Sequence, residues 1–267
     1  MMKSPYEQNL EKTLFAMLSD EALEIARFIC NDEEIHQWQE LSNSVSIRRL
    51  GFNDHGPVHM RKVTINAMNM FNILTEEGIQ PNMVKEDTGS YEDSRIAVLL
   101  AAFLHDIGMS IGRGNHEMSS FILSERIIDR VLKTILPEQL LRQIAIKSVA
   151  LEGILGHMTY HAISSLEAGI ILVADGCDME KGRSRIPMLI SHESRVGAIH
   201  KYSASSVESV TITKGTEKPI KISIVMTASV GFFQVEEILI GKIMASTIKP
   251  YIELYANVID RDVKRYL

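Results

Sequence analysis

Apolar side chains recur at helical spacing through the N-terminal two thirds of the chain. From about residue 5 to 49, leucines and isoleucines follow the 3.6-residue period of amphipathic helices. The next helix is predicted to begin at Pro57, because proline is tolerated in a first turn, and to end at Gly78. Residues 79–93 are rich in proline, glycine and acids and predict a loop, followed by the apolar helix Ile96–Leu104. Further helices are predicted at about 116–132, 137–152 and 164–175.

The pattern changes to strands near residue 201. The runs VESVTIT and IKISIVM alternate in polarity around the turn-like KGTEKP, which predicts a hairpin. The following FFQVEEILIGKIMAST returns to helical spacing, and alternation resumes after Pro250. We therefore predict an N-terminal helical segment (1–50) that packs on the core, a helical domain (51–201) and a small α+β domain of hairpin, helix and strand (202–267). A sheet this small needs cover from its own helix, the main domain or a second subunit, so we expect a homodimer or a docked tail.

Composition excludes several classes of protein. The chain has 45% hydrophobic and 23% charged residues and a net charge of −6, with no basic tract of the kind that binds nucleic acid. Only Cys30 and Cys177 are present, which argues against a disulfide framework or zinc ribbon and fits a cytoplasmic location. The N-terminus lacks the order of a signal peptide, and the longest apolar run is shorter than the ~20 residues that cross a bilayer, so we expect no membrane association.

The pair His105-Asp106 ends the apolar run IAVLLAAFL and leads into the glycine-broken IGMSIGRGN. A buried imidazole and carboxylate need partners, because an uncompensated buried charge is very costly. Asp106 would lie at a helix C-terminus, where the macrodipole disfavours negative charge, so a metal cation would satisfy both groups. The dipeptide alone has a high false-positive rate as a motif, and its surroundings must decide.

Six residues at helix ends or glycines form the candidate metal site. Nitrogen and carboxylate ligands without thiolates suit Mn, Fe, Co, Ni, Zn or Mg, in one or two copies. With two ions, Asp106 is the natural bridge at the ~3.5–4 Å separation of dinuclear sites, and a hydroxide between them would be the nucleophile. The competing interpretations are a buried His-Asp hydrogen-bond network, a capping role for His116, and proton donation to a leaving group by His157. The six residues are His59, His105, Asp106, His116, His157 and Asp175. No role is assigned to His36, His55, His161, His192 and His200.

These segments carry a family resemblance over about residues 50–200. GPVHMRKV, LLAAFLHDIGMSIGRGNHE, GILGH and LEAGIILVADGCDMEKGR resemble, in order and context, the HD-domain metal-dependent phosphohydrolase superfamily. The resemblance implies an HD-type helical bundle in a mainly α chain. It also implies a first metal at four positions and matches His116 and His157 to members with two metals. The four positions are His59, His105, Asp106 and Asp175.

The sequence departs from the motifs of known branches of this superfamily, which narrows the range of expected substrates. No GYP tripeptide follows a histidine pair, as in cyclic-di-GMP phosphodiesterases, and no EDT follows the dyad, as in (p)ppGpp hydrolases. Met109 stands where deoxynucleoside triphosphate triphosphohydrolases have a histidine.

Basic residues near the motifs could bind phosphate. Arg113 lies between two glycines after the dyad, and Lys181 and Arg183 follow the last aspartate of the motif, with Lys62 a weaker candidate. Asp178 is interpreted either as a support for a ligand or as a loop residue.

The predicted activity is hydrolysis of a small phosphorylated substrate, a nucleotide or related phosphate ester, by attack of metal-bound hydroxide. Asp106 and His157 are the predicted catalytic residues. The alternatives are a diiron oxygenase of the same superfamily and a regulatory module that binds nucleotide without turnover.

Overall fold

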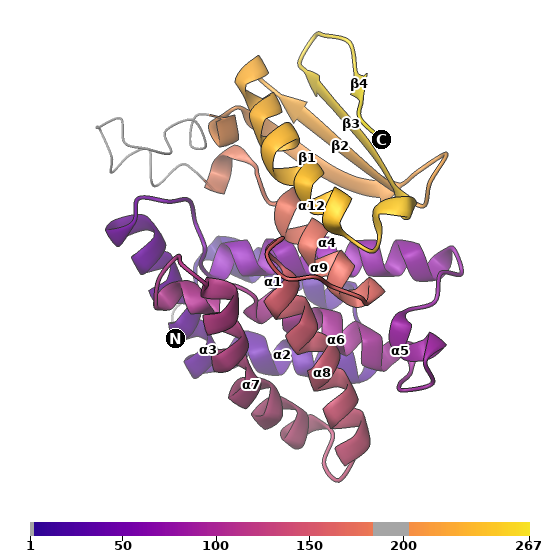
Figure 1. Ribbon diagram of the computed structural model, residues 1–267. Coiled ribbons are helices and arrows are strands. Elements are labelled where there is room, and N and C mark those ends of the chain that lie inside the picture. Colours follow the sequence, from indigo (N-terminus) through magenta and orange to yellow (C-terminus); the bar gives the residue numbers. More distant parts are fainter. Residues whose placement is uncertain (1–2, 184–202) are drawn as a thin grey trace.

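The computed structural model describes residues 3–183 and 203–267 as a helical body with a C-terminal sheet standing on one side of it (Figure 1). This is the mainly α architecture, with a small C-terminal α+β unit, that the sequence predicts. The body consists of α1 (Pro5–Ala16), α2 (Asp20–Asn31), α3 (Glu33–Ser44), the π-helical turn η1 (Val45–Arg49), α4 (Pro57–Glu76), α5 (Asn82–Lys85), α6 (Tyr91–Leu104), the 3₁₀ turn η2 (Ile107–Ser110), α7 (His116–Ile135), α8 (Leu140–Gly156), α9 (Leu166–Cys177) and the 3₁₀ turn η3 (Lys181–Arg183).

Helix α6 starts five residues before the apolar run that predicted it. Ser90 and Asp93 form a capping box in which each side chain accepts a hydrogen bond from the other residue's backbone N–H, at 3.1 and 2.8 Å. The apolar pattern alone marks only the buried part of the helix, so its polar first turn was missed. The predicted loop before it also contains the short helix α5.

Helix α6 is the central helix of the body. It contacts α2, α4, α5, α7, α8 and α9, and every residue from Ile96 to Leu104 is buried. A helix that is apolar on all sides is typical of such a position. Its C-terminal end, with His105 and Asp106, therefore lies inside the helical body.

The C-terminal part of the chain folds into a four-stranded sheet of order β1-β2-β3-β4. Strand β2 pairs antiparallel with β1 and parallel with β3, because a helical crossover separates β2 from β3. The hairpin, helix and strand match the sequence prediction, whereas β4 has only two residues and leaves no pattern. The elements are β1 (Val207–Lys214), β2 (Ile220–Met226), η4 (Ser229–Gly231), the π-helical η5 (Gln234–Leu239), α12 (Ile240–Ala245), η6 (Lys249–Tyr251), β3 (Ile252–Val258) and β4 (Lys264–Arg265).

The sheet and its crossover pack directly on the helical body. Helix α4 contacts β1 and β2, α9 contacts η5 and α12, and the buried apolar residues of both parts form one continuous cluster. Cover for the sheet thus comes from the body and from its own helix. The predicted domain boundary at 201/202 lies outside the described residues, and the division into domains stays a prediction. Within the described residues, no helix combines the length and the apolar character needed to cross a membrane.

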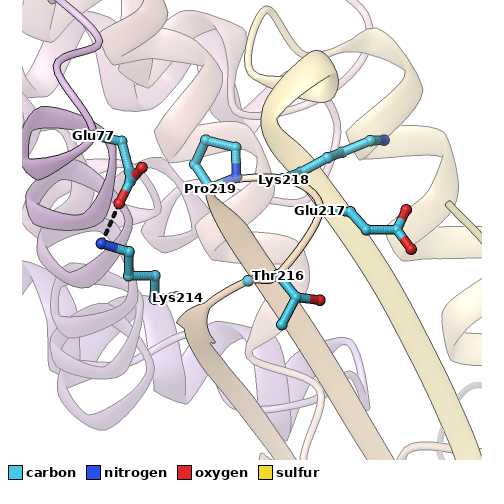
Figure 2. A pocket seen from close by; sticks show the side chains of 7 residues that line it. Glu77, Lys214, Thr216, Glu217, Lys218 and Pro219 are labelled. Atoms are coloured by element: carbon cyan, nitrogen blue, oxygen red, sulfur yellow. Dashed lines mark ion pairs between the residues drawn. The ribbon is translucent and has the colours of Figure 1, made fainter.

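A small polar pocket of about 140 Å³ lies beside the β1–β2 turn at the C-terminal end of α4 (Figure 2). It is lined by Glu77 and by residues 214–219, and Lys214 forms an ion pair with Glu77. At 1.5 Å per residue, this end of α4 is roughly 27 Å from His59. The pocket is thus separate from the candidate metal residues.

Candidate metal centre

Buried histidine and aspartate side chains meet where the ends of α4, α6, α7, α8 and α9 converge. His59 lies in the first turn of α4, Asp106 follows α6, and Asp175 lies in the last turn of α9. Each member is at most 8% exposed. The cluster comprises His55, His59, His105, Asp106, His116, His157 and Asp175.

A close contact between η2 and α7 brings His116 to the dyad. The Gly108 amide donates to Ser120 Oγ at 2.9 Å, and a Cβ on Gly108 would lie only 2.2 Å from the carbonyl oxygen of His116. Any larger residue would therefore push η2 and α7 apart. Gly108 is thus needed for the close approach of η2 and α7.

The Asp106 carboxylate lies between two groups of histidines. Its Oδ1 is 3.3 Å from His116 Nε2 and 3.4 Å from His157 Nε2. Its Oδ2 is 3.2 Å from His59 Nε2 and 2.6 Å from His55 Nδ1. Among the described residues, buried Oδ1 has no hydrogen-bond partner. The two oxygens therefore face two different sets of nitrogen ligands.

Asp175 belongs to the group that contains His59 and His105. Its Oδ1 is 3.3 Å from His59 Nε2 and 3.7 Å from His105 Nε2. His105 Nε2 is in turn 3.5 Å from Asp106 Oδ2. Four side chains, two histidines and two aspartates, thus direct donor atoms to a common point.

In three of the rings, a backbone carbonyl fixes the nitrogen that points away from the cluster. His105 Nδ1 donates to the Ala102 carbonyl at 2.8 Å, and His157 Nδ1 donates to the Ile154 carbonyl at 2.6 Å. His116 Nδ1 donates to the Arg113 carbonyl at 3.0 Å. Such bonds place the proton of a neutral ring on Nδ1 and leave a lone pair on Nε2, which is the usual arrangement in metal-binding histidines.

Two pairs of these inward nitrogens face each other. His59 Nε2 is 3.2 Å from His105 Nε2, and His116 Nε2 is 3.1 Å from His157 Nε2. Two lone pairs at that distance repel unless a proton or a cation lies near both. The donor set, with the unpaired Asp106 oxygen, fits two divalent ions of the kinds predicted from the sequence.

Burial and charge set the protonation of the histidines. Burial lowers the pKa of His157 to about 4 and that of His55 to about 3, so both rings are neutral at pH 7. Burial and the nearby Arg183 also oppose protonation of His59, but hydrogen bonds to three aspartate carboxylates outweigh them and raise its pKa to about 10. Without a metal, the His59 imidazolium would therefore supply part of the positive charge that the carboxylates require.

The two central carboxylates are ionised. Burial alone would raise the pKa of Asp106, but its interactions with the surrounding histidines hold it well below its usual range. The pKa of Asp175 is likewise low despite burial, chiefly because of the Lys242 ammonium. Both side chains are therefore available as anionic ligands at any pH near neutrality.

His55 and Lys242 of the centre were not identified from the sequence, and Asp178 was left open between a support for a ligand and a loop residue. His55, to which no role was assigned, contacts Asp106. Asp178 Oδ2 accepts from His59 Nδ1 at 2.7 Å, and its other oxygen is 2.7 Å from Lys62 Nζ. Lys242 of α12 forms an ion pair with Asp175. The spacing of His55 four residues before His59 was a usable signal, whereas nothing in the local sequence indicates Lys242.

The predicted phosphate-binding residues lie in different surroundings. Arg183 Nη2 is 3.2 Å from His55 Nδ1 and 3.3 Å from His59 Nε2, at the edge of the cluster. Exposed Arg113 has its guanidinium over the Phe52 ring at 5.5 Å. The Lys181 ammonium is bound by an exposed carboxylate of β1, Glu208. The structure thus brings Arg183 to the candidate metal ligands but does not bring Lys181 there.

Other histidines lie away from this centre. His36 packs against buried Glu7 at 3.4 Å, in a small group that also includes exposed Glu40. The Arg61 guanidinium, 4.0 Å from Glu7, already supplies positive charge there. Half-buried His161 is 3.8 Å from Glu117, while His192 and His200 lie outside the described residues.

Comparison with known proteins agrees with this geometry. The family model of the HD domain matches residues 58–180, a span that includes all six predicted ligands. The chain therefore belongs to the HD-domain superfamily of metal-dependent phosphohydrolases. It is also 40% identical over 230 residues to the uncharacterized protein MJ1020 of Methanocaldococcus jannaschii, a match that covers 86% of each chain. No solved structure matches the chain.

Proposed function

We propose that the protein is a dinuclear phosphohydrolase that cleaves a nucleotide or a related small phosphate ester. The observation that carries the proposal is the position of Asp106, whose two oxygens face two separate groups of histidine nitrogens, the assigned ones at 3.2–3.5 Å. A carboxylate in this position can give one oxygen to each of two ions. We assign His59, His105 and Asp175 to one ion and His116 and His157 to the other.

The residues of the chain have distinct tasks in this proposal. Bound ions would supply Lewis acidity and a water nucleophile at neutral pH. Arg183 is held by the Asp54 and Asp178 carbonyls at 2.9 and 2.8 Å, which leaves Nη2 directed at the cluster. A guanidinium fixed in this way can orient a phosphoryl oxygen and balance its charge.

His157 serves as a ligand in this proposal rather than as a proton donor. Its Nδ1 is committed to the Ile154 carbonyl, and burial lowers the pKa of the ring to about 4. A general acid at neutral pH needs a pKa near the working pH. A neutral, buried ring with an inward lone pair meets the requirements of a metal ligand instead.

The test is hydrolysis by protein stripped of metal and reloaded separately with Mn, Fe, Co, Ni, Zn or Mg. The panel contains p-nitrophenyl phosphate, its diester, and nucleoside mono-, di- and triphosphates, with released phosphate or nucleoside as the readout. We expect turnover with at least one ion, and loss of both activity and bound metal in Asp106→Ala. Asp262→Ala, which removes an exposed aspartate of the C-terminal loop, is the matched control and should retain both.

Each contrary outcome has a defined meaning. Full turnover by metal-free Asp106→Ala would overturn the mechanism. Oxygen consumption by iron-loaded protein, with no phosphate ester cleaved under any ion, would indicate the diiron oxygenase. Tight nucleotide binding without turnover under every ion would indicate the regulatory module.

A further inference from the structure

The C-terminal unit contributes a buried ammonium group to the metal centre. Lys242 of α12 is only 7% exposed, and it pairs with Asp175 and donates to the His157 carbonyl at 2.8 Å. It therefore joins the last turn of α9 to the end of α8. Both of these helix ends carry candidate ligands.

Close packing holds this lysine in place. A Cβ on Gly176, the residue after Asp175, would lie 3.1 Å from Cδ of Lys242. Two helical turns earlier, a Cβ on Gly169 would lie 2.0 Å from Oγ1 of Thr247. Ser246 Oγ also donates to the Gly169 carbonyl at 2.9 Å. Helix α9 is thus docked along its length against the segment that carries Lys242.

The two oxygens of Asp175 have different partners. Oδ1 faces the inward nitrogens of His59 and His105, whereas Oδ2 is occupied by the Lys242 ammonium. The lysine therefore fixes the rotation of the carboxylate and leaves one oxygen for a metal. It also balances a buried negative charge that would otherwise be costly.

We propose that Lys242 is a positioning residue of the metal centre, which presents Asp175 through one oxygen and moderates the affinity for the ion that Asp175 binds. This inference rests on the metal centre proposed above. The HD domain match ends at residue 180, so the C-terminal unit supplies a part of the site from outside the matched span.

If Lys242 balances the charge of Asp175, its removal has an effect on stability that depends on bound metal, which the loss of a packing contact alone does not have. Lys242→Met keeps the apolar stem but leaves Oδ2 of Asp175 without its cation, and a bound metal ion can replace the lost ammonium. The melting temperature of metal-free Lys242→Met should therefore be lower than that of wild type, and saturating Mn²⁺ should remove most of the difference. Affinity for the first Mn²⁺ should rise by about tenfold or more, because a neighbouring positive charge is gone.

The variants are compared by thermal unfolding and by Mn²⁺ titration followed by electron paramagnetic resonance. Lys242→Arg keeps the charge and should stay within about threefold of wild-type affinity on the same Coulomb argument. Lys264→Met removes an exposed lysine of the same unit, paired with Glu236, and should change neither readout. Lys242→Gln, which keeps a donor for the His157 carbonyl, gives the same neutral comparison if Lys242→Met does not fold.

The outcomes separate this proposal from the metal centre itself. Wild-type protein that binds no Mn²⁺ would overturn both. A second result would overturn only the role of Lys242. In that result, wild-type protein binds Mn²⁺, Lys242→Met loses the same stability with and without Mn²⁺, and its Mn²⁺ affinity equals that of wild type. Failure of both neutral variants to fold even in Mn²⁺ would show a packing role and would also overturn it.

Discussion

Gly108 links the HD dyad to the second group of ligands, and Gly108→Ala tests that link. The added Cβ would lie 2.2 Å from the His116 carbonyl oxygen and 2.3 Å from the Ser120 amide nitrogen, both backbone atoms. Ordinary contacts begin at 3.4 Å, so the two segments must separate by about 1 Å. That displacement moves His116 relative to Asp106.

The cost can be estimated from two contributions. Overpacking of a close contact costs about 1–3 kcal/mol, and weakening the bond from the Gly108 amide to Ser120 Oγ adds about 0.5–1.5 kcal/mol. We therefore expect the free energy of unfolding of the metal-free protein to fall by about 1.5–4.5 kcal/mol. The number of bound Mn²⁺ ions should fall from two to one.

Urea denaturation and Mn²⁺ titration measure these two effects. Gly112→Ala is the matched control, because a Cβ on that glycine of the same loop meets nothing within 4 Å. It should leave stability within about 0.5 kcal/mol of wild type, as for an ordinary surface change, and keep two ions. A Gly108→Ala variant that has the stability of wild type and binds two Mn²⁺ ions with wild-type affinity would refute the reasoning.

Three other perturbations probe the support of the ligands, their protonation and the phosphate site. Asp178→Asn weakens the hydrogen bond from His59 Nδ1 and should therefore lower Mn²⁺ affinity by about 10–100-fold in a calorimetric titration. Unchanged affinity would show that Asp178 pairs with Lys62 but does not support metal binding by His59. Because the pKa of His59 is raised to about 10, metal binding at pH 7.5 should release about one proton from this ring, and affinity should rise about tenfold per pH unit from pH 7 to 9. Calorimetry in buffers of different ionisation enthalpy counts that proton, and no release would contradict the assignment. Arg183→Gln should raise KM for a hydrolysed substrate by about 10–150-fold, because a lost charged hydrogen bond costs about 1.5–3 kcal/mol, whereas Lys181→Gln should raise it by less than about twofold. Equal effects in steady-state kinetics would contradict the placement of Arg183.

Much of the helical body follows from local patterns, and these were readable in the sequence. The run Ile96–Leu104 is apolar on every side, so its burial and the inward position of the polar pair after it could be predicted together. The six predicted ligands lie at helix ends, where chain direction changes and side chains from distant segments can converge. The start of α6 was missed because its first turn is polar and is specified by Ser90 and Asp93.

The remaining features depend on contacts between distant segments. Lys242 lies in a sequence, ILIGKIMA, that indicates only an amphipathic helix, and its pairing with Asp175 arises from tertiary packing. The parallel pairing of β2 with β3 similarly depends on the crossover through η5 and α12. His55 was set aside because a lone histidine has many structural roles, and its contact with Asp106 depends on the loop before α4.

In the proposed centre, Asp106 would give one oxygen to each of two ions, which the surrounding histidines and Asp175 would hold. Anomalous diffraction from crystals of the protein grown with Mn²⁺ tests it most directly. We predict two anomalous peaks about 3.5–4 Å apart, one on each side of the Asp106 carboxylate. The absence of peaks among these residues, with His116 and His157 hydrogen-bonded to each other through Nε2, would contradict the account.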